Sequence, residues 1–171
     1  MPQWISPDRE NIFPNLHRSI YEKTSEENDR NNCAAWAAGD ASRWMQPPVE
    51  PWHYWPAEAP LDLDVDSFVK AYELIGFEIC ADATYEAGYQ KLAIYGYPDR
   101  TFSHAARLNE NGSWSSKLGC WEDIKHDTLR ALEGRWPAYG KVYVYMKRKI
   151  VVDEAGNVIE THEHAGDFKE W

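Results

Sequence analysis

Residues 91–118 read KLAIYGYPDRTFSHAARLNENGSWSSKL, and this stretch decides the fold of the chain. Two runs within it, 91–95 and 102–108, have the composition of strands. The Asn-Gly pair that follows them is typical of a hairpin turn, so 113–118 is expected to be the next antiparallel strand. His104 therefore lies on an inner strand of the predicted sheet.

A second informative stretch lies about seventy residues before His104 and reads Asn31-Asn32-Cys33-Ala34-Ala35-Trp36-Ala37. Its alanines favour a helix from Cys33 to about Trp44, with a preceding polar residue as cap. A thiolate at a helix start is stabilised by the helix dipole and by unpaired backbone N–H groups. A small cysteine among alanines is also a common packing residue, so both roles of Cys33 stay open.

The remaining elements complete an α+β domain. A helix is expected from Asp64 or Asp66 to Ile75, because Gly76 supplies its C-terminal stop. The other predicted elements are a stiff proline-rich aromatic loop at 46–60, a strand at 77–80, a helix at 123–132 with His126 on its polar face, and a terminal hairpin of 142–152 and 158–164. We expect a single domain over 32–171, preceded by an extended arm over 1–31.

The composition of the chain limits the classes of partner and the cellular location that we expect for it. The net charge of −10, with no basic run longer than 147–149, argues against a nucleic-acid partner. No stretch has the length and apolarity of a membrane span or the pattern of a signal peptide, so a cytoplasmic location and no membrane partner are expected. Cys33, Cys80 and Cys120 show no CxxC spacing, which favours reduced thiols and no bound cofactor.

Several motifs together resemble a family of small bacterial proteins that is defined only as a domain of unknown function. The motifs span about residues 13–148 and are Asn32-Cys33-Ala34-Ala35-Trp36-Ala37-Ala38-Gly39-Asp40, Tyr54-Trp55-Pro56, Gly76-Phe77-Glu78-Ile79-Cys80, Lys91-Leu92-Ala93-Ile94-Tyr95, His104-Ala105-Ala106-Arg107 and Gly112-Ser113-Trp114-Ser115-Ser116-Lys117-Leu118-Gly119. This resemblance implies a family but no activity.

More distantly, the order of cysteine helix, histidine strand and next strand is similar to the papain-like superfamily, including the NlpC/P60 and CHAP cysteine peptidases and amidases. The likeness implies a papain-like fold, with Cys33 as nucleophile and His104 as base. In NlpC/P60 enzymes a His, Asn or Gln on the next strand orients the imidazole. Ser116 stands nearest to that position, and a serine departs from the pattern.

The first functional hypothesis is a thiol hydrolase or transferase acting on an amide or peptide bond. Cys33 attacks the acyl carbon, His104 moves the proton and Ser116 holds the imidazole tautomer. Backbone N–H groups at the helix start, with the Asn32 amide, bind the oxyanion. The candidate substrate-binding residues are Trp36, Trp55 and Lys117. A peptidase, a cell-wall amidase, a deamidase and a domain that has lost its chemistry all fit these residues.

Two other hypotheses compete with the thiol enzyme. The acidic charge and the aromatic run Trp52-His53-Tyr54-Trp55 suit a non-enzymatic adaptor or immunity-type protein that binds a basic protein partner. His162 and His164, spaced i, i+2 on the last predicted strand with Glu160, have the pattern of a metal site. Such a face near a chain end is more often solvated, so no metal is expected.

Overall fold

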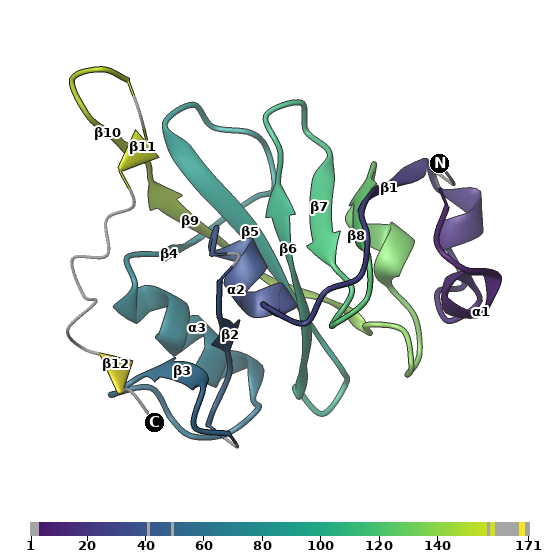
Figure 1. Cartoon of the computed structure of the whole chain (residues 1–171), viewed down its shortest axis with the longest axis horizontal. Helices are drawn as coiled ribbons and strands as arrows, with labels where there is room; N and C mark the ends of the chain where they lie inside the picture. Colours follow the sequence, from purple (N-terminus) through teal and green to yellow (C-terminus); the bar gives the residue numbers. More distant parts are fainter. Residues whose placement is uncertain (1–3, 41, 49, 157, 160–167, 170–171) are drawn as a thin grey trace.

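A computed structural model describes residues 4–40, 42–48, 50–156, 158–159 and 168–169. It is an α+β domain built on a seven-stranded antiparallel sheet in the order β1-β8-β7-β6-β5-β9-β4 (Figure 1). These strands are β1 (Tyr21–Ser25), β4 (Glu78–Cys80), β5 (Tyr89–Gly96), β6 (Phe102–Leu108), β7 (Trp114–Lys117), β8 (Asp123–His126) and β9 (Lys141–Lys149). The predicted fold class is confirmed at this level, and the strand assignments around 91–118 are correct.

Strand β6 holds His104 near the middle of the sheet. On one side, β6 pairs with β5 in the register Tyr95↔His104. On its other side it pairs with β7 only through Arg107↔Ser115 and Leu108↔Trp114. Strands β6 and β7 therefore separate beyond Arg107, and Ala105 lies at that opening.

The two main helices differ in how well the sequence predicts them. Helix α3 (Val65–Leu74) begins after Asp64, whose side chain accepts the N–H of Asp66, as expected. Helix α2 (Cys33–Ala37) begins at Cys33 as expected, but the predicted end near Trp44 is wrong. The helix stops because Gly39 takes a left-handed conformation, with φ of 89°. A two-stranded parallel pairing of β2 (Trp44–Met45) with β3 (His53–Pro56) follows.

One other prediction, a helix, is wrong, and the expected terminal hairpin is confirmed only in part. The helix expected at 123–132 is strand β8 followed by the short 3-10 helix η2 (Leu129–Leu132). The long strand of the expected terminal hairpin is instead β9, which lies inside the main sheet between β5 and β4. A small hairpin of β10 (Val151–Val152) and β11 (Val158–Ile159) follows it, and β12 (Phe168–Lys169) pairs with β3.

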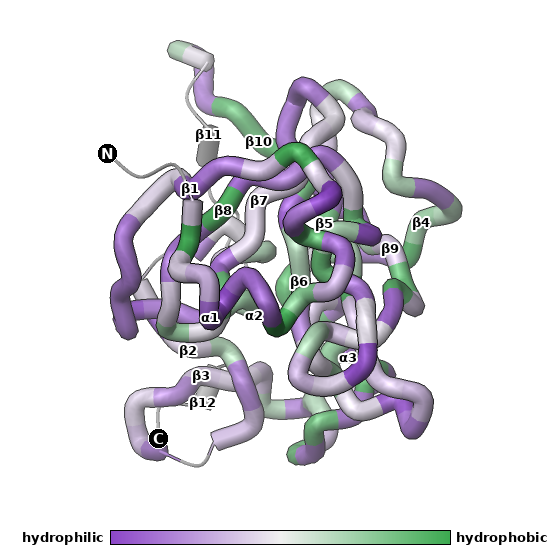
Figure 2. The backbone as a smooth tube through the Cα atoms, turned by 90° about the vertical axis from the view of Figure 1, so that its right-hand side faces the viewer, coloured by the Kyte–Doolittle hydropathy of each residue, from purple (hydrophilic) through white to green (hydrophobic). Residues whose placement is uncertain are grey.

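The sheet carries a core on each face, because successive strand residues point to opposite sides. Leu92 and Ile94 of β5 pack with the residues of α2 and α3, whereas Ala93 and Tyr95 pack with the N-terminal segment and η2. In Figure 1, α2 crosses β6, and α1 (Pro7–Glu10) lies at the opposite end from α3. Figure 2, in which the backbone is coloured by residue hydropathy, shows hydrophobic residues along parts of β6 and β8 and hydrophilic residues in many loops.

The segment expected to be an extended arm contributes regular structure and core residues. It contains α1, the 3-10 helix η1 (Leu16–Arg18) and the edge strand β1, which pairs with β8. Ile5, Phe13, Leu16 and Tyr21 are buried in the second core. None of the helices in the described part of the chain is long and apolar enough to cross a membrane.

Candidate functional site

Cys33 is the first residue of α2 and lies buried, with 8% of its surface exposed. Burial raises the pKa of its thiol to about 11, because a thiolate loses more solvation than a thiol does. Backbone N–H groups, that of Ala105 first, and the charge of Lys117 act in the opposite direction and do not offset burial. The short helix therefore leaves Cys33 as a neutral thiol at pH 7.

Asn32 caps α2 and joins it to β2. Its Oδ1 accepts the N–H groups of Ala35 at 3.1 Å and Met45 at 3.0 Å, and its Nδ2 donates to the Met45 carbonyl at 3.0 Å. The amide predicted to bind an oxyanion is thus engaged in holding two elements together.

His104 belongs to a buried hydrogen-bonded chain with Ser116 and His126. Ser116 Oγ lies 2.9 Å from His104 Nε2 and 2.8 Å from His126 Nε2. His126 Nδ1 lies 2.7 Å from the carbonyl of Thr128, so this nitrogen carries the proton and donates. His126 Nε2 then accepts the Ser116 hydroxyl, and Ser116 Oγ accepts Nε2–H of His104. Both imidazoles are neutral, because burial lowers the pKa of His126 to about 4 and that of His104 well below its usual range.

Because His104 donates through its Nε2–H, its Nδ1 is a buried acceptor with no hydrogen-bond partner among the described residues. The ring stacks on Tyr139, with centroids 4.3 Å apart, and meets Tyr95 edge-on. His104 thus lies on the side of the second core, whereas Ala105, the next residue along β6, faces α2. The structure brings His104 and Ser116 together, as predicted, but within the described residues Cys33 and His104 make no hydrogen bond with each other.

The predicted substrate-binding residues are mostly engaged in packing. Lys117 is fully buried, and its Nζ donates to the Trp121 carbonyl at 2.6 Å and lies 3.8 Å from Asp123 Oδ1. Burial lowers the pKa of Lys117. Trp55 is 1% exposed and donates its Nε1–H to the Pro60 carbonyl. Trp36 is half-buried, with the guanidinium of Arg107 5.6 Å from the ring centroid.

The aromatic run at 52–55 packs on the core, except for one exposed side chain. His53, Tyr54 and Trp55 are buried, and Trp52 is 58% exposed. Only Trp52 therefore presents a large apolar side chain of this run to solvent.

Sequence reasoning missed His126 and Tyr139 as neighbours of His104. His126 was expected on a helix surface, but it closes the hydrogen-bonded chain from β8. The alternation in Asp123-Ile124-Lys125-His126 is the signal that could have shown a strand. Tyr139 follows β8 by thirteen residues in an irregular segment, and no local pattern indicates its contact with His104.

No metal centre is present in the part of the chain that the structure describes. There, no group of three or more His, Cys, Asp or Glu side chains is placed to hold a metal ion. The candidate ligands Glu160, His162 and His164 lie outside the described residues.

Comparison with known proteins gives a family and no activity. The family model described as "Domain of unknown function (DUF7689)" matches residues 22–147. No curated protein and no solved structure matches the chain.

Proposed function

Since the chain belongs to this family of unknown function, we propose its role from the geometry alone: it is a non-enzymatic binding or adaptor domain in which Cys33 packs rather than reacts. The observation that carries this proposal is the burial of Cys33, whose thiol pKa is raised to about 11. At pH 7 only about one Cys33 side chain in ten thousand would be a thiolate, the form that attacks an acyl carbon.

The hydrogen bonds of the other candidate site residues also support a structural role for them. Asn32, Ser116 and Lys117 each have hydrogen-bond partners inside the protein that tie neighbouring elements together. The net charge of −10 favours association with a basic partner, because it attracts such a partner over a distance of about a Debye length.

Thiol labelling tests the proposal within a single chain, because the three cysteines differ in exposure. Cys33 is buried, Cys80 is half-buried and Cys120 is exposed. The folded protein is treated with iodoacetamide at pH 7, and the labelled peptides are followed by mass spectrometry. We expect Cys33 to label at least about a hundredfold more slowly than Cys120, and to become reactive in urea. Labelling of Cys33 faster than Cys120, with an apparent pKa below about 8, would overturn the proposal.

A papain-like thiol hydrolase or transferase acting on an amide or peptide bond is the second candidate, and one observation favours it. The hydrogen bond of His104 Nε2 to Ser116 leaves His104 Nδ1 as a base without a partner in the described structure. A catalytic imidazole needs this arrangement, with one nitrogen oriented and the other left for the nucleophile. The thiol of Cys33 would have to move from its buried position to use it.

Paired variants distinguish this second candidate. Hydrolysis of an activated peptide anilide is measured for the unmodified chain, for Cys33→Ala and for Cys120→Ala as the control. Loss of turnover in Cys33→Ala alone would establish the thiol enzyme. Turnover that is absent or equal in all three proteins removes it.

A further inference from the structure

A groove of about 590 Å³ opens at the end of the sheet where β5 turns into β6 and where β9 begins. Figure 1 shows the β5–β6 turn at the opposite end of the sheet from the β6–β7 turn. One wall of the groove is the turn at 96–99, and parts of the loop at 134–141 form the other wall. The volume is in the range of sites that bind a ligand.

The loop at 134–141 is held in place by hydrogen bonds. Gly134 and Gly140 exchange N–H···O=C hydrogen bonds of 2.9 and 2.8 Å, which close the loop at its ends. The Tyr97 hydroxyl donates to the Ala138 carbonyl at 2.8 Å and so ties the loop to the opposite wall. A partner that binds this loop therefore has little disorder to remove from it.

This fixed loop presents a large aromatic side chain to solvent. Trp136 is 77% exposed and lines the groove together with Tyr97 and Pro98. Trp and Tyr are frequent anchors of protein interfaces, because each offers a large contact surface with few rotatable bonds. Exposed apolar surface of this kind beside a groove is typical of an interaction site.

The charged side chains along the groove are mainly cationic. Arg135 is exposed, and its side chain forms no hydrogen bond or ion pair within the described residues. Lys141 is also exposed, and its Nζ lies 5.1 Å from the centroid of the Tyr143 ring. The only carboxylate in the lining belongs to Asp99, which accepts the N–H of Thr101 at 3.0 Å. The groove thus carries two cations and one carboxylate beside its apolar walls.

A segment with complementary properties lies next to the groove. Residues 61–64 read Leu61-Asp62-Leu63-Asp64, and the two leucines are 62% and 53% exposed. The carboxylates of Asp62 and Asp64 accept N–H and O–H groups of the following residues, and neither is paired with a cation in the part of the chain that the structure describes. The segment therefore alternates exposed apolar side chains with uncompensated negative charges.

Backbone hydrogen bonds place this segment beside the groove. The Leu63 carbonyl accepts the N–H of Phe102 at 2.7 Å, and Asp64 forms a β-bridge with Thr101. The Thr101 carbonyl in turn accepts the N–H of Tyr97, which lines the groove, at 3.0 Å. The groove and segment 61–64 thus lie at the same end of the molecule, joined through the β5–β6 turn.

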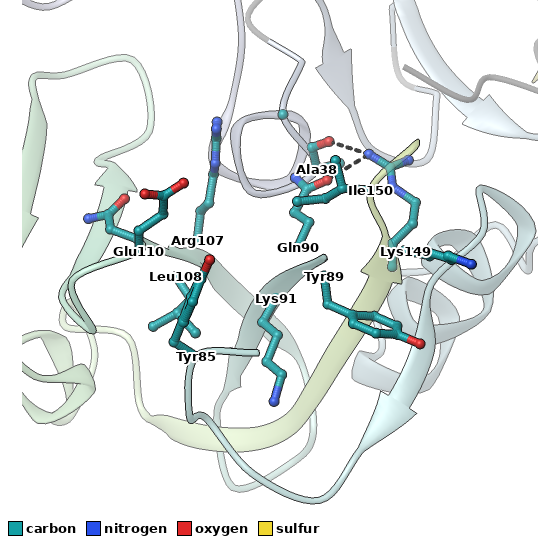
Figure 3. A pocket seen from close by; sticks show the side chains of 13 residues that line it. Ala38, Tyr85, Tyr89, Gln90, Lys91, Arg107, Leu108, Glu110, Lys149 and Ile150 are labelled. Atoms are coloured by element: carbon teal, nitrogen blue, oxygen red, sulfur yellow. Dashed lines mark hydrogen bonds between the residues drawn. The ribbon is translucent and has the colours of Figure 1, made fainter. Parts of the chain in front are cut away.

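A second cavity, of about 370 Å³, differs from the groove because its cations already serve the fold. Figure 3 shows this cavity, with Gln90 near its centre. The buried Arg148 guanidinium donates to the Ala38 carbonyl at 2.8 Å and to Gln90 Oε1 at 2.9 Å. Lys91 Nζ lies 3.2 Å from Asp82 Oδ1. These contacts tie α2, β5 and β9 together, so the groove is the better candidate for an interaction surface.

We propose that two copies of this chain form a dimer through this end of the molecule, each packing segment 61–64 against the groove of the other. The leucines contact the aromatic walls, and the aspartates pair with Arg135 and Lys141. One two-fold axis makes both contacts at once, because the two complementary surfaces are neighbours on each copy. Both copies carry a net charge of −10, so the local pairing of opposite charges has to offset their overall repulsion. This inference goes beyond the proposed adaptor role and does not depend on it.

Sedimentation equilibrium of the full chain tests the proposal. We expect a monomer–dimer equilibrium with a Kd of about 100 µM or below. Trp136→Ala is expected to weaken dimerisation by at least about tenfold, because it removes the largest exposed side chain of the groove. The control is Trp4→Ala, which is expected to leave the Kd unchanged, because Trp4 is 57% exposed and contacts Tyr21 on the edge strand β1.

Charge reversal tests whether the groove and segment 61–64 contact each other. Arg135→Glu and Asp62→Lys are each expected to weaken dimerisation by about tenfold, and the double variant is expected to restore it, because the ion pair forms again with its charges exchanged. Asp62 also holds the turn before α3 through its hydrogen bonds. Leu61→Lys, at an exposed position, therefore serves as the second variant of this segment and is also expected to weaken dimerisation.

Four results would overturn the inference. They are a chain that stays monomeric up to about 1 mM, which would leave the groove to a different partner, an equal Kd for Trp136→Ala and Trp4→Ala, association of Leu61→Lys as tight as that of the unmodified chain, and association that continues beyond the dimer. The dimer does not involve the reactivity of Cys33, so sedimentation and thiol labelling give separate results.

Discussion

At the scale of single residues, Ser116 is the centre of the buried polar chain, because it contacts both histidines through one oxygen. Removing its hydroxyl leaves a buried donor on His104 and a buried acceptor on His126 without a partner. Ser116→Ala is therefore expected to lower the free energy of unfolding by about 2 kcal/mol.

The neighbouring serine provides the control for this variant. Ser115 is half-buried and donates to Asn109 Oδ1 at 2.9 Å near the surface turn. Ser115→Ala is expected to cost less than about 1 kcal/mol, as measured by urea unfolding of both variants. Equal losses in the two variants would contradict a special role for Ser116.

The same histidines make stability depend on pH. The pKa of His126 is about 4 in the folded protein, below its ordinary value, so the unfolded chain binds the proton first as pH falls. The stabilisation is complete above about pH 6.5 and is lost as pH falls towards 4. Between pH 7.5 and 5 we expect His126 alone to lower the free energy of unfolding by about 2 kcal/mol.

Urea unfolding at the two pH values measures this loss. His126→Gln is expected to reduce it, whereas His17→Gln, at an exposed histidine of η1, should leave it unchanged. An identical acid dependence in His126→Gln and in the unmodified chain would exclude His126 as its source.

At the scale of elements, α2 depends on Asn32 because the helix is only five residues long. One Asn32 side chain caps the helix and makes two hydrogen bonds to Met45 of β2. Asn32→Ala is expected to lower the free energy of unfolding by about 2–3 kcal/mol, since it removes a cap and leaves buried backbone groups unpaired. Asn28→Ala is the control, because Asn28 is half-buried and, among the described residues, its side chain accepts a hydrogen bond from the N–H of Arg30 alone.

Chemical denaturation of the two asparagine variants measures the loss in the free energy of unfolding for each. A loss in Asn32→Ala no larger than in Asn28→Ala would show that α2 is held by its alanines alone. A fully retained stability would also reopen the Asn32 amide for the oxyanion role predicted from the sequence.

Elements whose partners are close in sequence could be predicted. The β6–β7 hairpin was predicted from the Asn-Gly turn, and the contact of His104 with Ser116 was expected from the resemblance to the NlpC/P60 enzymes. Strand β8 was misread as a helix although it pairs with its neighbour β7 as well as with the distant β1, because its four residues show the alternation of a strand only briefly. The placement of Cys33 relative to His104 depends on how α2 packs on the sheet, which local sequence does not determine.

At the scale of the whole molecule, the N-terminal segment is tied to the second core and through it to the histidine chain. Phe13 is 1% exposed and meets the Tyr139 ring edge-on at 5.0 Å, and Tyr139 stacks on His104. The matched family region begins at residue 22, yet this earlier segment covers one face of the sheet.

Phe13→Ala tests whether this segment is an integral part of the fold. Removing a fully buried ring leaves a cavity beside Tyr139, so a loss of about 3–5 kcal/mol in the free energy of unfolding is expected. Ile20→Ala is the control from the same segment, because Ile20 is 79% exposed and its loss should change stability by no more than about 0.5 kcal/mol. Both are measured by urea unfolding, followed by Trp fluorescence. A single transition that shifts in Phe13→Ala makes the segment part of one cooperative unit, whereas an unshifted transition would show that the sheet and its histidine chain fold without it.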